Sequence, residues 1–483
     1  MTSRSLLERL VEPVDARVPA IFRIVIGLVI ASDFADRLRD AFTFYSSQGL
    51  LAPDAEIATI PSLNLLFFGT APSPARVVCF FIFGFLVVAC FTLGYRTRLA
   101  AVATWAVVHA IQMRNLVIGD GGDTVLRILL FWALFVDLGA TMSLDVAWHR
   151  RPAQETVPGF PVRLLRAQIA VIYLFAGLAK TGQSWIDGSA VYYAVQNIDF
   201  GRPWGLWLAA HLSLARLVAF GTLAVELGFA PLVLLPWRRS LLRALGLVSG
   251  LGLHVGIALT MRVGIFSVVL PASYTIFLSR QWIEAIPWFR RGPQPTSPPP
   301  ANQTAATARP PMRATRATAA LWIMLVLQMG AVIYQLIAGN RAGKWAAGLY
   351  GELSAVGLSQ GWNMFSPEPP KRLTRFTAAG ELTDGRSIDV LAAAAPKMIA
   401  ESGVIYSRWY KYRSDLARDN PQYLTVLGRY LCRRYNSETD GARLRQFTLT
   451  QYWRELPPPG STGPSSWEKA DILRQPCLLT PAQ

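Results

Sequence analysis

The stretch RVVCFFIFGFLVVACFTLGY, residues 76–95, decides the class of fold. After Arg76 it contains no charged side chain, and as a helix it is long enough to cross the roughly 30 Å hydrocarbon core of a bilayer. A helix on the surface of a soluble protein has a polar face, whereas this one would be apolar all round. We therefore predict a membrane-spanning helix, and similar stretches lie on both sides of it.

The composition of the whole chain also indicates a membrane protein. Of the 483 residues, 52% are hydrophobic and 16% are charged, against about 25% charged in a usual soluble domain. This hydrophobic content argues against disorder. The net charge is +17, but the basic residues lie in a mainly apolar chain, unlike those of a nucleic-acid binder. No nucleic acid is therefore expected as a partner. Four cysteines are too few for a scaffold built on disulfides.

Apolar runs long enough for a membrane helix recur along most of the chain. They predict a polytopic α-helical membrane protein with about nine transmembrane helices, whose first partner is the lipid bilayer. The ionisable residues Arg23, Asp33 and Arg127 lie within these runs, which a bundle tolerates where they face its interior. The predicted spans are 18–36, 76–95, 99–113, 123–141, 163–181, 212–235, 241–259, 263–280 and 318–338.

The basic residues give the chain a direction across the membrane. Arginines precede the first predicted span and recur on every second connection, as the positive-inside rule expects. We therefore expect a multi-pass protein of a cell inner membrane, with a cytoplasmic N-terminus and, after nine spans, an external (periplasmic) C-terminus. High usage of Ala, Arg and Pro indicates a bacterial source. The basic connections include Arg96, Arg98, Arg150, Arg151, Arg163, Arg238, Arg239, Arg280 and Arg290.

Changes in composition divide the chain into five parts. The predicted parts are an interfacial amphipathic helix at 1–17, a membrane bundle of eight spans at 18–280, a Pro-rich cytoplasmic linker at 281–317, the ninth transmembrane helix at 318–338 and an external C-terminal domain at 340–483. In the last part charges return and apolar residues alternate with polar ones. Asp384-Gly385 is a hairpin signal, and the length suits one extramembrane α+β domain.

Ionisable residues gather in the outer half of the predicted bundle. Lys180 lies near the outer end of the fifth span, His254 in the outer half of the seventh and Arg262 at the turn that follows, while Glu226 lies near the middle of the sixth. A lysine in a desolvated pocket can act as a general base, whereas a lysine at a helix end can also snorkel to the interface. Both interpretations stay open, as do a structural role for His254 and a pairing of Glu226 with Arg127 or Arg262.

The segment GDGGD, residues 119–123, connects the third and fourth predicted spans. It lacks the spacing and the lysine of a phosphate-binding loop, and we expect a tight turn in which Asp123 caps the next helix. The four histidines are far apart and no CxxC occurs, so no metal site is expected. Cys432 and Cys477 both fall in the predicted external domain, where an oxidising environment allows them to form a disulfide.

The segment RAQIAVIYLFAGLAKTGQSWIDGSAVYY, residues 166–193, resembles the lysine-bearing span of the vitamin K-dependent gamma-carboxylases. Other segments resemble the wider HTTM (horizontally transferred transmembrane) domain family, and the chain is identified as a member of that superfamily. The positions that carry the resemblance are Tyr173, Ala176, Gly177, Lys180, Trp185 and Gly188, Arg23 with Gly27, RNLVIGDGGD at 114–123, HVGIALTMRVGIFSVVLPA at 254–272, and GLYGELSAVGLSQGWNMFSPEP at 348–369.

The resemblance implies quinol chemistry. In the carboxylases the lysine at the position of Lys180 deprotonates a quinol, oxygen converts the quinol to an epoxide, and the strong base so formed allows a glutamate side chain to be carboxylated. It implies Lys180 and His254 as catalytic residues and a reduced menaquinone or vitamin K-type quinol as the small-molecule partner. Two departures are that Ala179 replaces a lysine and that residues 137–145 lack an Asn-His pair. The further pocket residues implied are Trp185, Asp187, Arg262, Asn115, Asp123, Glu226, Trp362 and Met364.

Three functions remain open on the sequence. The first is a quinol-oxidising epoxidase or a gamma-carboxylase-like lyase, acting at the outer membrane face on a quinol alone or together with a secreted peptide or protein. The second is a non-catalytic maturation or assembly factor that holds such a partner with its external domain. The third is a proton-coupled transporter in which Glu226, Lys180 and His254 relay protons.

Overall fold

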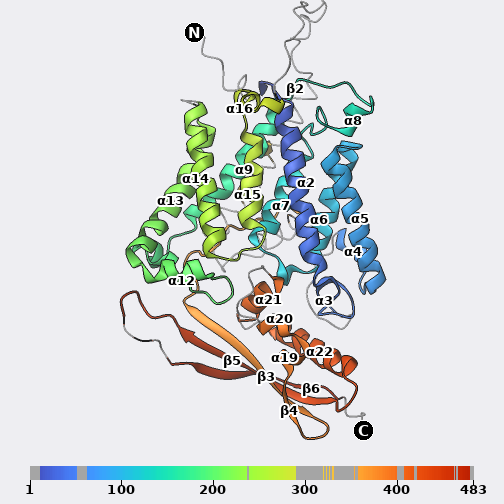
Figure 1. Ribbon diagram of the computed structural model, residues 1–483, viewed down its shortest axis with the longest axis vertical. Helices are drawn as coiled ribbons and strands as arrows, with labels where there is room; N and C mark the ends of the chain where they lie inside the picture. The colour runs from blue at the N-terminus through green and yellow to red at the C-terminus, as the bar shows by residue number, and fades with distance from the viewer. Residues whose placement is uncertain are drawn as a thin grey trace, which may run out of the picture.

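The computed structural model describes residues 11–51, 63–235, 239–289, 357–399, 407–417, 421–461 and 466–478, with a few single positions between these ranges. Figure 1 shows two parts, a bundle of roughly parallel helices and a smaller domain of strands and helices packed against one end of it. We call this end of the bundle the domain end. The opposite end, near the start of the chain, is the linker end.

Five helices in the described residues are long and apolar enough to cross a membrane. They support the prediction of a helical membrane protein, whereas the count of nine spans stays a prediction. The apolar run at 76–95 forms one of them, which begins after the capping hydroxyl of Ser73 and ends at Gly94, whose φ of 72° suits a glycine. The five are α2 (Arg17–Leu38), α5 (Pro74–Leu93), α9 (Gly159–Leu178), α13 (Leu212–Leu234) and α14 (Arg239–Thr260).

Two predicted spans are shorter than the sequence suggests. The apolar run 123–141 forms only α7 (Gly121–Ala133), about 20 Å at 1.5 Å per residue, and it lies in the core with most of its side chains buried. The chain then turns, and the guanidinium of Arg23 donates hydrogen bonds to the carbonyls of Leu138 and Met142. The run 263–280 forms α15 (Phe266–Ser273), which tightens after Pro271 into the 3-10 helix η2 (Tyr274–Phe277). By contrast, α6 (Thr97–Arg114) matches its predicted span.

The start of the chain, at the linker end, does not form the amphipathic helix that the sequence predicts over residues 1–17. Residues 1–10 lie outside the described part of the chain, and Val14–Asp15 form strand β1, which pairs with β2 (Thr156–Val157). The Asp15 carboxylate accepts the backbone N–H of Arg17, one of the free N–H groups at the start of α2. Most of the predicted linker and of the ninth span, 318–338, also lies outside the described residues.

Short helices connect the long ones and close the two ends of the bundle. At the domain end they hold the loops that carry the candidate site. They are α3 (Ala41–Tyr45), α4 (Leu63–Phe68), η1 (Leu116–Ile118), α8 (Leu144–Ala147), α10 (Gln183–Ile186), α11 (Ala190–Val195), α12 (Pro203–Ala210), α16 (Arg280–Ala285) and η3 (Pro287–Phe289).

The C-terminal domain is an α+β unit, as the alternating pattern predicts. Its strands β3 (Arg372–Leu382), β4 (Ser387–Asp389), β5 (Leu444–Glu455) and β6 (Glu468–Pro476) form an antiparallel sheet in the order β4-β3-β5-β6. The predicted turn at Asp384-Gly385 joins β3 to β4, and Gly385 has a φ of 85°. The helices α19 (Val390–Ala394), α20 (Pro396–Ile399), α21 (Arg408–Leu416) and α22 (Pro421–Glu438) lie between the sheet and the bundle (Figure 1).

A disulfide joins Cys432 in α22 to Cys477 just after β6, which is the pairing that the sequence predicts. We expect Cys432→Ser to lower the free energy of unfolding of this domain, because the bond closes a loop between residues 45 apart and such a loop is worth roughly 4 kcal/mol. Thermal unfolding in detergent, followed by cysteine alkylation, measures the effect. Cys79→Ser, at an unpaired and exposed cysteine of α5, is the control and should change little. Two freely alkylated thiols at 432 and 477 in non-reduced protein would contradict the pairing.

Candidate functional site

Lys180 follows the C-terminal end of α9 and is enclosed by the bundle. Its Nζ lies 2.9 and 2.8 Å from the two carboxylate oxygens of Glu226 on α13 and donates to the carbonyl of Ala176 at 3.0 Å. It also lies 5.1 Å from the ring centre of Trp185. The Lys180 side chain is 3% exposed, so it does not snorkel to the interface. Glu226 therefore pairs with Lys180, and the pairing with Arg127 or Arg262 considered from the sequence is wrong.

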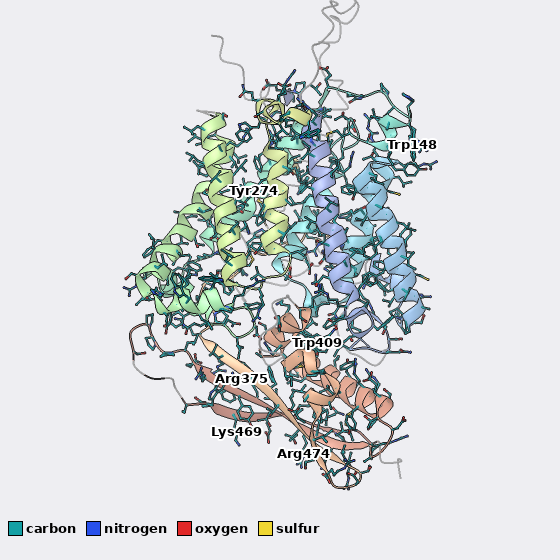
Figure 2. The ribbon with its side chains drawn as sticks, in the orientation of Figure 1. Trp148, Tyr274, Arg375, Trp409, Lys469 and Arg474 are labelled. Carbon is teal, nitrogen blue, oxygen red and sulfur yellow. A yellow bond between two sulfur atoms is a disulfide. The ribbon has the colours of Figure 1, made fainter. Side chains whose placement is uncertain are left out.

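A second polar group lies two turns earlier along α9. The hydroxyl of Tyr173 is 2.6 Å from Nε2 of His254 on α14 and also contacts the hydroxyl of Tyr274, which Figure 2 places within the bundle. The ring of Tyr173 stacks on Phe229 with centres 4.0 Å apart, and Phe229 lies on α13, the helix that carries Glu226. Hydrogen bonds and packing thus bring the two predicted catalytic residues, Lys180 and His254, into one region of the bundle.

An apolar groove reaches His254 from the side of the bundle. It has a volume of about 500 Å³ and runs between α2, α14 and α15. Leu28 and Val268 line it and remain exposed on the flank of the bundle, where lipid would lie. In the described residues Nδ1 of His254 has no hydrogen-bond partner, although the residue is buried. The groove is also lined by Ser267, whose buried Oγ has no partner in the described residues, so it combines apolar walls with two unpartnered polar atoms.

A segment of the C-terminal part is bound to the loop that follows Lys180. The backbone N–H of Gly182 donates to the carbonyl of Pro367 at 3.1 Å, and the indole N–H of Trp185 donates to the carbonyl of Phe365 at 2.8 Å. Ser184 donates to the Glu368 carboxylate through its backbone and its hydroxyl. Burial alone would raise the pKa of Glu368, but the bonds from Ser184 lower it below its ordinary value. We call residues 365–368 the strap.

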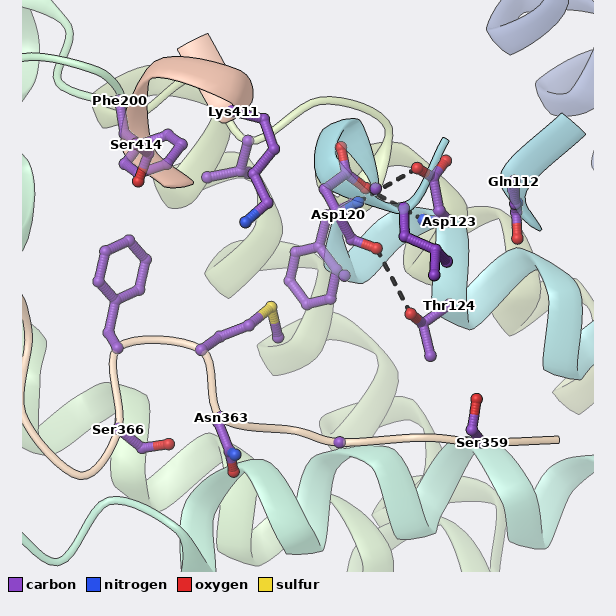
Figure 3. Close-up of a pocket in the computed structure, with 18 of the residues that line it drawn as sticks. Gln112, Asp120, Asp123, Thr124, Phe200, Ser359, Asn363, Ser366, Lys411 and Ser414 are labelled. Carbon is purple, nitrogen blue, oxygen red and sulfur yellow. Dashed lines mark hydrogen bonds between the residues drawn. The ribbon is translucent and has the colours of Figure 1, made fainter. Parts of the chain in front are cut away.

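A pocket of about 500 Å³ lies where the strap, the domain end and α21 meet (Figure 3). Asp120 and Thr124 at the start of α7 enter it from one side, and Lys411 of α21 from another. Two of its buried polar atoms, Nε2 of Gln112 and Oγ of Ser366, have no partner in the described residues. We call it the junction pocket. It is also lined by Met113, Leu116, Phe200, Val263, Phe266, Ser359, Asn363, Met364, Phe365, Glu368 and Ser414.

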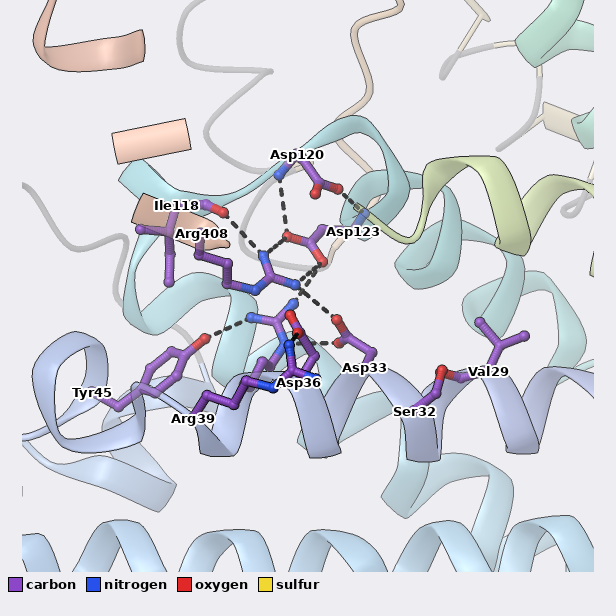
Figure 4. Close-up of polar contacts among 11 residues, drawn as sticks. Val29, Ser32, Asp33, Asp36, Arg39, Tyr45, Ile118, Asp120, Asp123 and Arg408 are labelled. Carbon is purple, nitrogen blue, oxygen red and sulfur yellow. Dashed lines mark hydrogen bonds and ion pairs between the residues drawn. The ribbon is translucent and has the colours of Figure 1, made fainter. Parts of the chain in front are cut away.

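Beside the junction pocket, four buried charges join the bundle to the C-terminal domain (Figure 4). Arg37 contacts Asp33, one turn earlier on α2, at 2.7 Å and Asp123 of α7 at 2.6 Å. Arg408 of α21 contacts the same two carboxylates at 2.7 and 2.9 Å. Burial opposes its charge, yet Asp123 and Asp33 hold the pKa of Arg408 well above its ordinary value. We call these four residues the charge cluster; its two positive and two negative charges balance.

The GDGGD turn is a helix cap, as predicted, but the capping residue differs. Asp120, rather than Asp123, is the N-cap of α7 and accepts the backbone N–H of Asp123 at 3.0 Å. Asp123 returns a bond from its carboxylate to the Asp120 N–H at 3.1 Å, which completes a capping box. Burial and the neighbouring Asp123 charge raise the pKa of Asp120 to about 6. The helix begins at Gly121, so Asp120 stands at the N-cap and Asp123 at the third helical position, where its carboxylate can only return the bond.

The other predicted pocket residues have mainly structural contacts. Asp187 accepts the N–H of Ser189 in a turn, and Asn115 accepts the N–H of Val117 and donates to the Phe44 carbonyl. The guanidinium of Arg262 lies 5.0 Å from the ring centre of Tyr410. Trp362 is buried and donates to Gln360, whereas Met364 lines the junction pocket.

No group of three potential metal ligands occurs among the described residues.

Sequence reasoning missed several of the contacts that form the site. Asp33 and Arg37 lie four residues apart on an apolar helix, a spacing that signals an ion pair. Arg408 gave no comparable signal, because it lies 375 residues from Asp33 in an ordinary polar segment. The resemblance singled out Tyr173 but not Tyr274, and only the fold shows that their hydroxyls meet.

Comparison with known proteins agrees with the location of the bundle. The family model of the HTTM domain matches residues 11–282. Two proteins of Bacillus subtilis (strain 168) are similar over shorter stretches. The uncharacterized protein YitO is 30% identical over 133 residues, 26% of this chain and 40% of YitO. The sporulation-delaying protein SdpB is 29% identical over 118 residues, 23% of this chain and 36% of SdpB. The matches thus span two fifths or less of these relatives, and no solved structure matches.

We expect Arg408→Leu to destabilise the junction between bundle and domain by about 3–5 kcal/mol, because it leaves two buried carboxylates with one cation. Limited proteolysis and thermal unfolding of the full chain in nanodiscs measure the effect. Arg434→Leu is the control, since Arg434 forms an exposed pair with Glu438 and such pairs contribute at most about 1 kcal/mol. Equal effects of the two substitutions would show that the charge cluster does not hold the junction.

We expect Asp120→Asn to raise stability near pH 7 by on the order of 1 kcal/mol. The pKa of about 6 in the folded protein exceeds the usual 3.8, so the folded state binds this proton more tightly than the unfolded chain. The stability from that proton is present below about pH 4 and is lost as the pH rises through about 6. Asparagine keeps the cap without the charge. Thermal unfolding between pH 4 and 8 should therefore flatten in this variant and keep its slope in Asp384→Asn, an exposed turn residue.

Proposed function

The chain belongs to the HTTM domain family, and from that membership we propose that it is an integral membrane enzyme that oxidises a lipid-soluble quinol with Lys180 as the general base. The observation that carries the proposal is the buried Lys180–Glu226 pair beside the hydrogen-bonded Tyr173 and His254. Charged pairs inside a membrane bundle are costly, and they commonly mark proton pathways. The proposed ligand is a reduced menaquinone or a vitamin K-type quinol.

The apolar groove at His254 fits such a ligand. Its volume of about 500 Å³ lies within the range of small-molecule sites, which combine apolar walls with a few placed polar groups. The groove opens on the flank of α2, α14 and α15, so a ligand could enter from the bilayer without crossing water. Nδ1 of His254, which lacks a partner in the described residues, would accept or donate a hydrogen bond to a ring oxygen.

We propose that the residues behind His254 form the first part of a route for a proton towards Lys180. Nε2 of His254 contacts the Tyr173 hydroxyl, and Tyr173 lies on α9 about two turns before Lys180, which pairs with Glu226. For Lys180 to act as a base it must first pass its own proton to Glu226, which leaves a neutral amine and a neutral acid. Burial favours that exchange over separated charges because neither product is charged. In this proposal Lys180 then takes the proton that His254 and Tyr173 pass towards it, across the two turns of α9 for which no hydrogen bond joins Tyr173 to the pair in the described residues.

Oxygen would be the oxidant in this scheme. A quinol and one O₂ give an epoxide and one water, so one oxygen atom enters the ring and the other leaves as water. We propose that this occurs at the outer face of the inner membrane, with the N-terminus cytoplasmic and the C-terminal domain periplasmic. The resemblance to the gamma-carboxylases extends the scheme to a carboxylation, although Ala179 and residues 137–145 lack two features of those enzymes.

A second function is favoured by the junction pocket. Its wall combines charged and hydroxyl groups with apolar ones and belongs half to the bundle and half to the C-terminal domain. Such a wall suits a polypeptide better than a lipid ring, because Gln112 and Ser366 present unpartnered polar atoms among the described residues. We therefore also propose a role in the maturation or assembly of a secreted peptide or protein, either coupled to the quinol chemistry or without it.

The test is epoxide formation by the full chain in nanodiscs, supplied with menaquinol or vitamin K hydroquinone and oxygen and assayed by mass spectrometry. We expect Lys180→Ala to lower the rate at least 100-fold, since general bases typically contribute 10²–10⁴-fold. Glu226→Gln should also lower it, because glutamine cannot take the lysine proton. Lys397→Ala is the matched control: this lysine forms an exposed pair with Asp40 and should leave the rate unchanged.

The same variants separate the two proposed functions. Turnover that is absent in folded protein, or equal in Lys180→Ala and the unsubstituted chain, would rule out the quinol enzyme. If the maturation function alone holds, a secreted partner should still mature in cells that carry Lys180→Ala, and its maturation should fail when residues 345–483 are deleted.

A further inference from the structure

Helix α12 is apolar on all sides, yet part of its surface is exposed. Its sequence, PWGLWLAA, contains no charged side chain. One side packs on the bundle through the buried residues Gly205, Leu208 and Ala209. The other side consists of Trp204 (64% exposed), Leu206 (56%) and Trp207 (49%). A helix beside water has a polar face, whereas a helix that is apolar all round belongs in a protein core or a membrane. We therefore expect something other than water to cover this side of α12.

Backbone contacts hold α12 across the end of two long helices. The N–H of Arg202, which precedes α12, donates to the carbonyl of Thr260 at the end of α14 at 2.9 Å. Gly205 allows this close approach, because a Cβ there would lie 2.5 Å from the same carbonyl oxygen. Leu212, two residues after α12, begins α13, and Figure 1 shows α12 at the domain end beside both helices. Since α13 and α14 are long and apolar enough to cross a membrane, α12 lies where they would leave it.

Among the described residues, the exposed tryptophans of the bundle lie at its two ends. Trp204 and Trp207 belong to the domain end. Trp148, 56% exposed, lies near the linker end in Figure 2, and Trp288, 92% exposed, follows α16, which Figure 1 places at the same end. Two belts of tryptophan on either side of an aliphatic band are the pattern at the two faces of a bilayer. The large side chains exposed along α13 and α14 between the belts are mainly aliphatic, and they include Leu217, Phe220, Leu227, Leu241, Leu245, Val248, Leu251 and Val255.

Arginines flank α12 on both sides. Arg202 precedes the helix, and Arg216 lies one turn into α13, where it is exposed. A guanidinium at such a place can reach the phosphates of lipid headgroups while its stem lies along apolar surface. A second copy of the chain or a soluble partner would explain the apolar side of α12 but not the matching tryptophans at the opposite end of the bundle. A bilayer explains both.

We propose that α12 lies in the plane of the membrane interface, with Trp204 and Trp207 among the phospholipid headgroups, and that it marks the boundary of the bilayer at the domain end. The indole ring suits this layer because its body is apolar and its N–H stays within reach of water or phosphate. Trp148 and Trp288 mark the opposite boundary. This assignment depends on the membrane helices and not on the quinol or maturation functions proposed above.

A boundary at α12 also gives the depth of the Lys180–Glu226 pair. The stretch of α13 from Leu212 to Glu226 is about 20 Å long at 1.5 Å per residue. A tilt of about 40° would reduce its rise to about 15 Å, half of the roughly 30 Å hydrocarbon core. The pair therefore lies inside the hydrocarbon core, not near its outer edge as the sequence predicts for Lys180. This is the setting in which two opposite charges are retained only as a pair.

The experiment measures the depth of a nitroxide label on α12 in the full chain, reconstituted in phosphatidylcholine nanodiscs. The two unpaired cysteines of α5 are replaced by serine and the disulfide is left oxidised, so that the label attaches only to Leu206→Cys or, separately, to Trp207→Cys. Leu206→Cys keeps both tryptophans, which guards against a helix displaced by the loss of one. Collisions with oxygen, which concentrates in lipid, and with a nickel chelate, which stays in water, report the depth.

Two control positions bracket the expected depth. Val248→Cys, at a residue 68% exposed in the middle of α14, represents the hydrocarbon core, and Arg474→Cys, at an exposed residue of β6, represents water. We expect the labels at positions 206 and 207 to collide with the chelate several-fold less often than the label at 474 and several-fold more often than the label at 248. Collisions with oxygen should follow the reverse order.

The outcomes decide the proposal either way. Chelate collisions on α12 equal to those at position 474 would place the helix in water, and collisions equal to those at 248 would place it in hydrocarbon; either result would overturn the proposal. Shielding from both reagents, or spin–spin broadening in discs that hold two chains, would assign this side of α12 to a protein contact and also overturn it. Neither turnover nor maturation is measured, so the result is independent of the two proposed functions.

Discussion

The structure at the domain end depends on the need to pair buried charges. Asp33 and Arg37 on α2, Asp123 on α7 and Arg408 on α21 lie in contact with side chains at most 4% exposed. An ion removed from water is strongly destabilising unless opposite charges and hydrogen bonds replace its hydration. Neither half of the protein satisfies this condition alone, because without Arg408 the bundle would hold two carboxylates and one cation. The C-terminal domain therefore completes the bundle electrostatically.

The contact between the C-terminal domain and the bundle also fixes the loop after Lys180. The strap contacts Gly182, Ser184 and Trp185, and the ring of Trp185 covers the lysine ammonium. The domain thus closes the end of the bundle over the Lys180–Glu226 pair and forms half of the junction pocket. Two candidate sites result: the groove at His254 opens on the apolar flank of the bundle, and the junction pocket lies beside the C-terminal domain. Chemistry that joins a lipid-soluble reagent to a polypeptide would need both environments within one chain.

Hydrophobicity alone predicted the fold class, the long helices and the α+β character of the C-terminal domain, because these depend on local composition and periodicity. Hydrophobicity overestimated the length of α7. The side chains of the apolar run 123–141 are apolar because they are buried inside the bundle, and they do not form a full membrane span. The resemblance drew attention to Lys180 and His254. Their partners were beyond sequence reasoning: Glu226 is 46 residues from Lys180, and its choice of partner depends on how α9 and α13 pack. The junction pocket likewise depends on contacts between distant segments.

The Lys180–Glu226 pair limits what a lysine can do in such a bundle. An unpaired ammonium buried there would lose its proton to water. The neutral amine could then accept one proton, but no neighbouring group would remove that proton again. Pairing with Glu226 keeps the total charge at zero whether the proton is on the amine or on the carboxylate. Moving the proton between the two changes no net charge in the low-dielectric interior, so the amine can be freed and reprotonated at modest cost. The glutamate is therefore as much a part of the proposed base as the lysine itself.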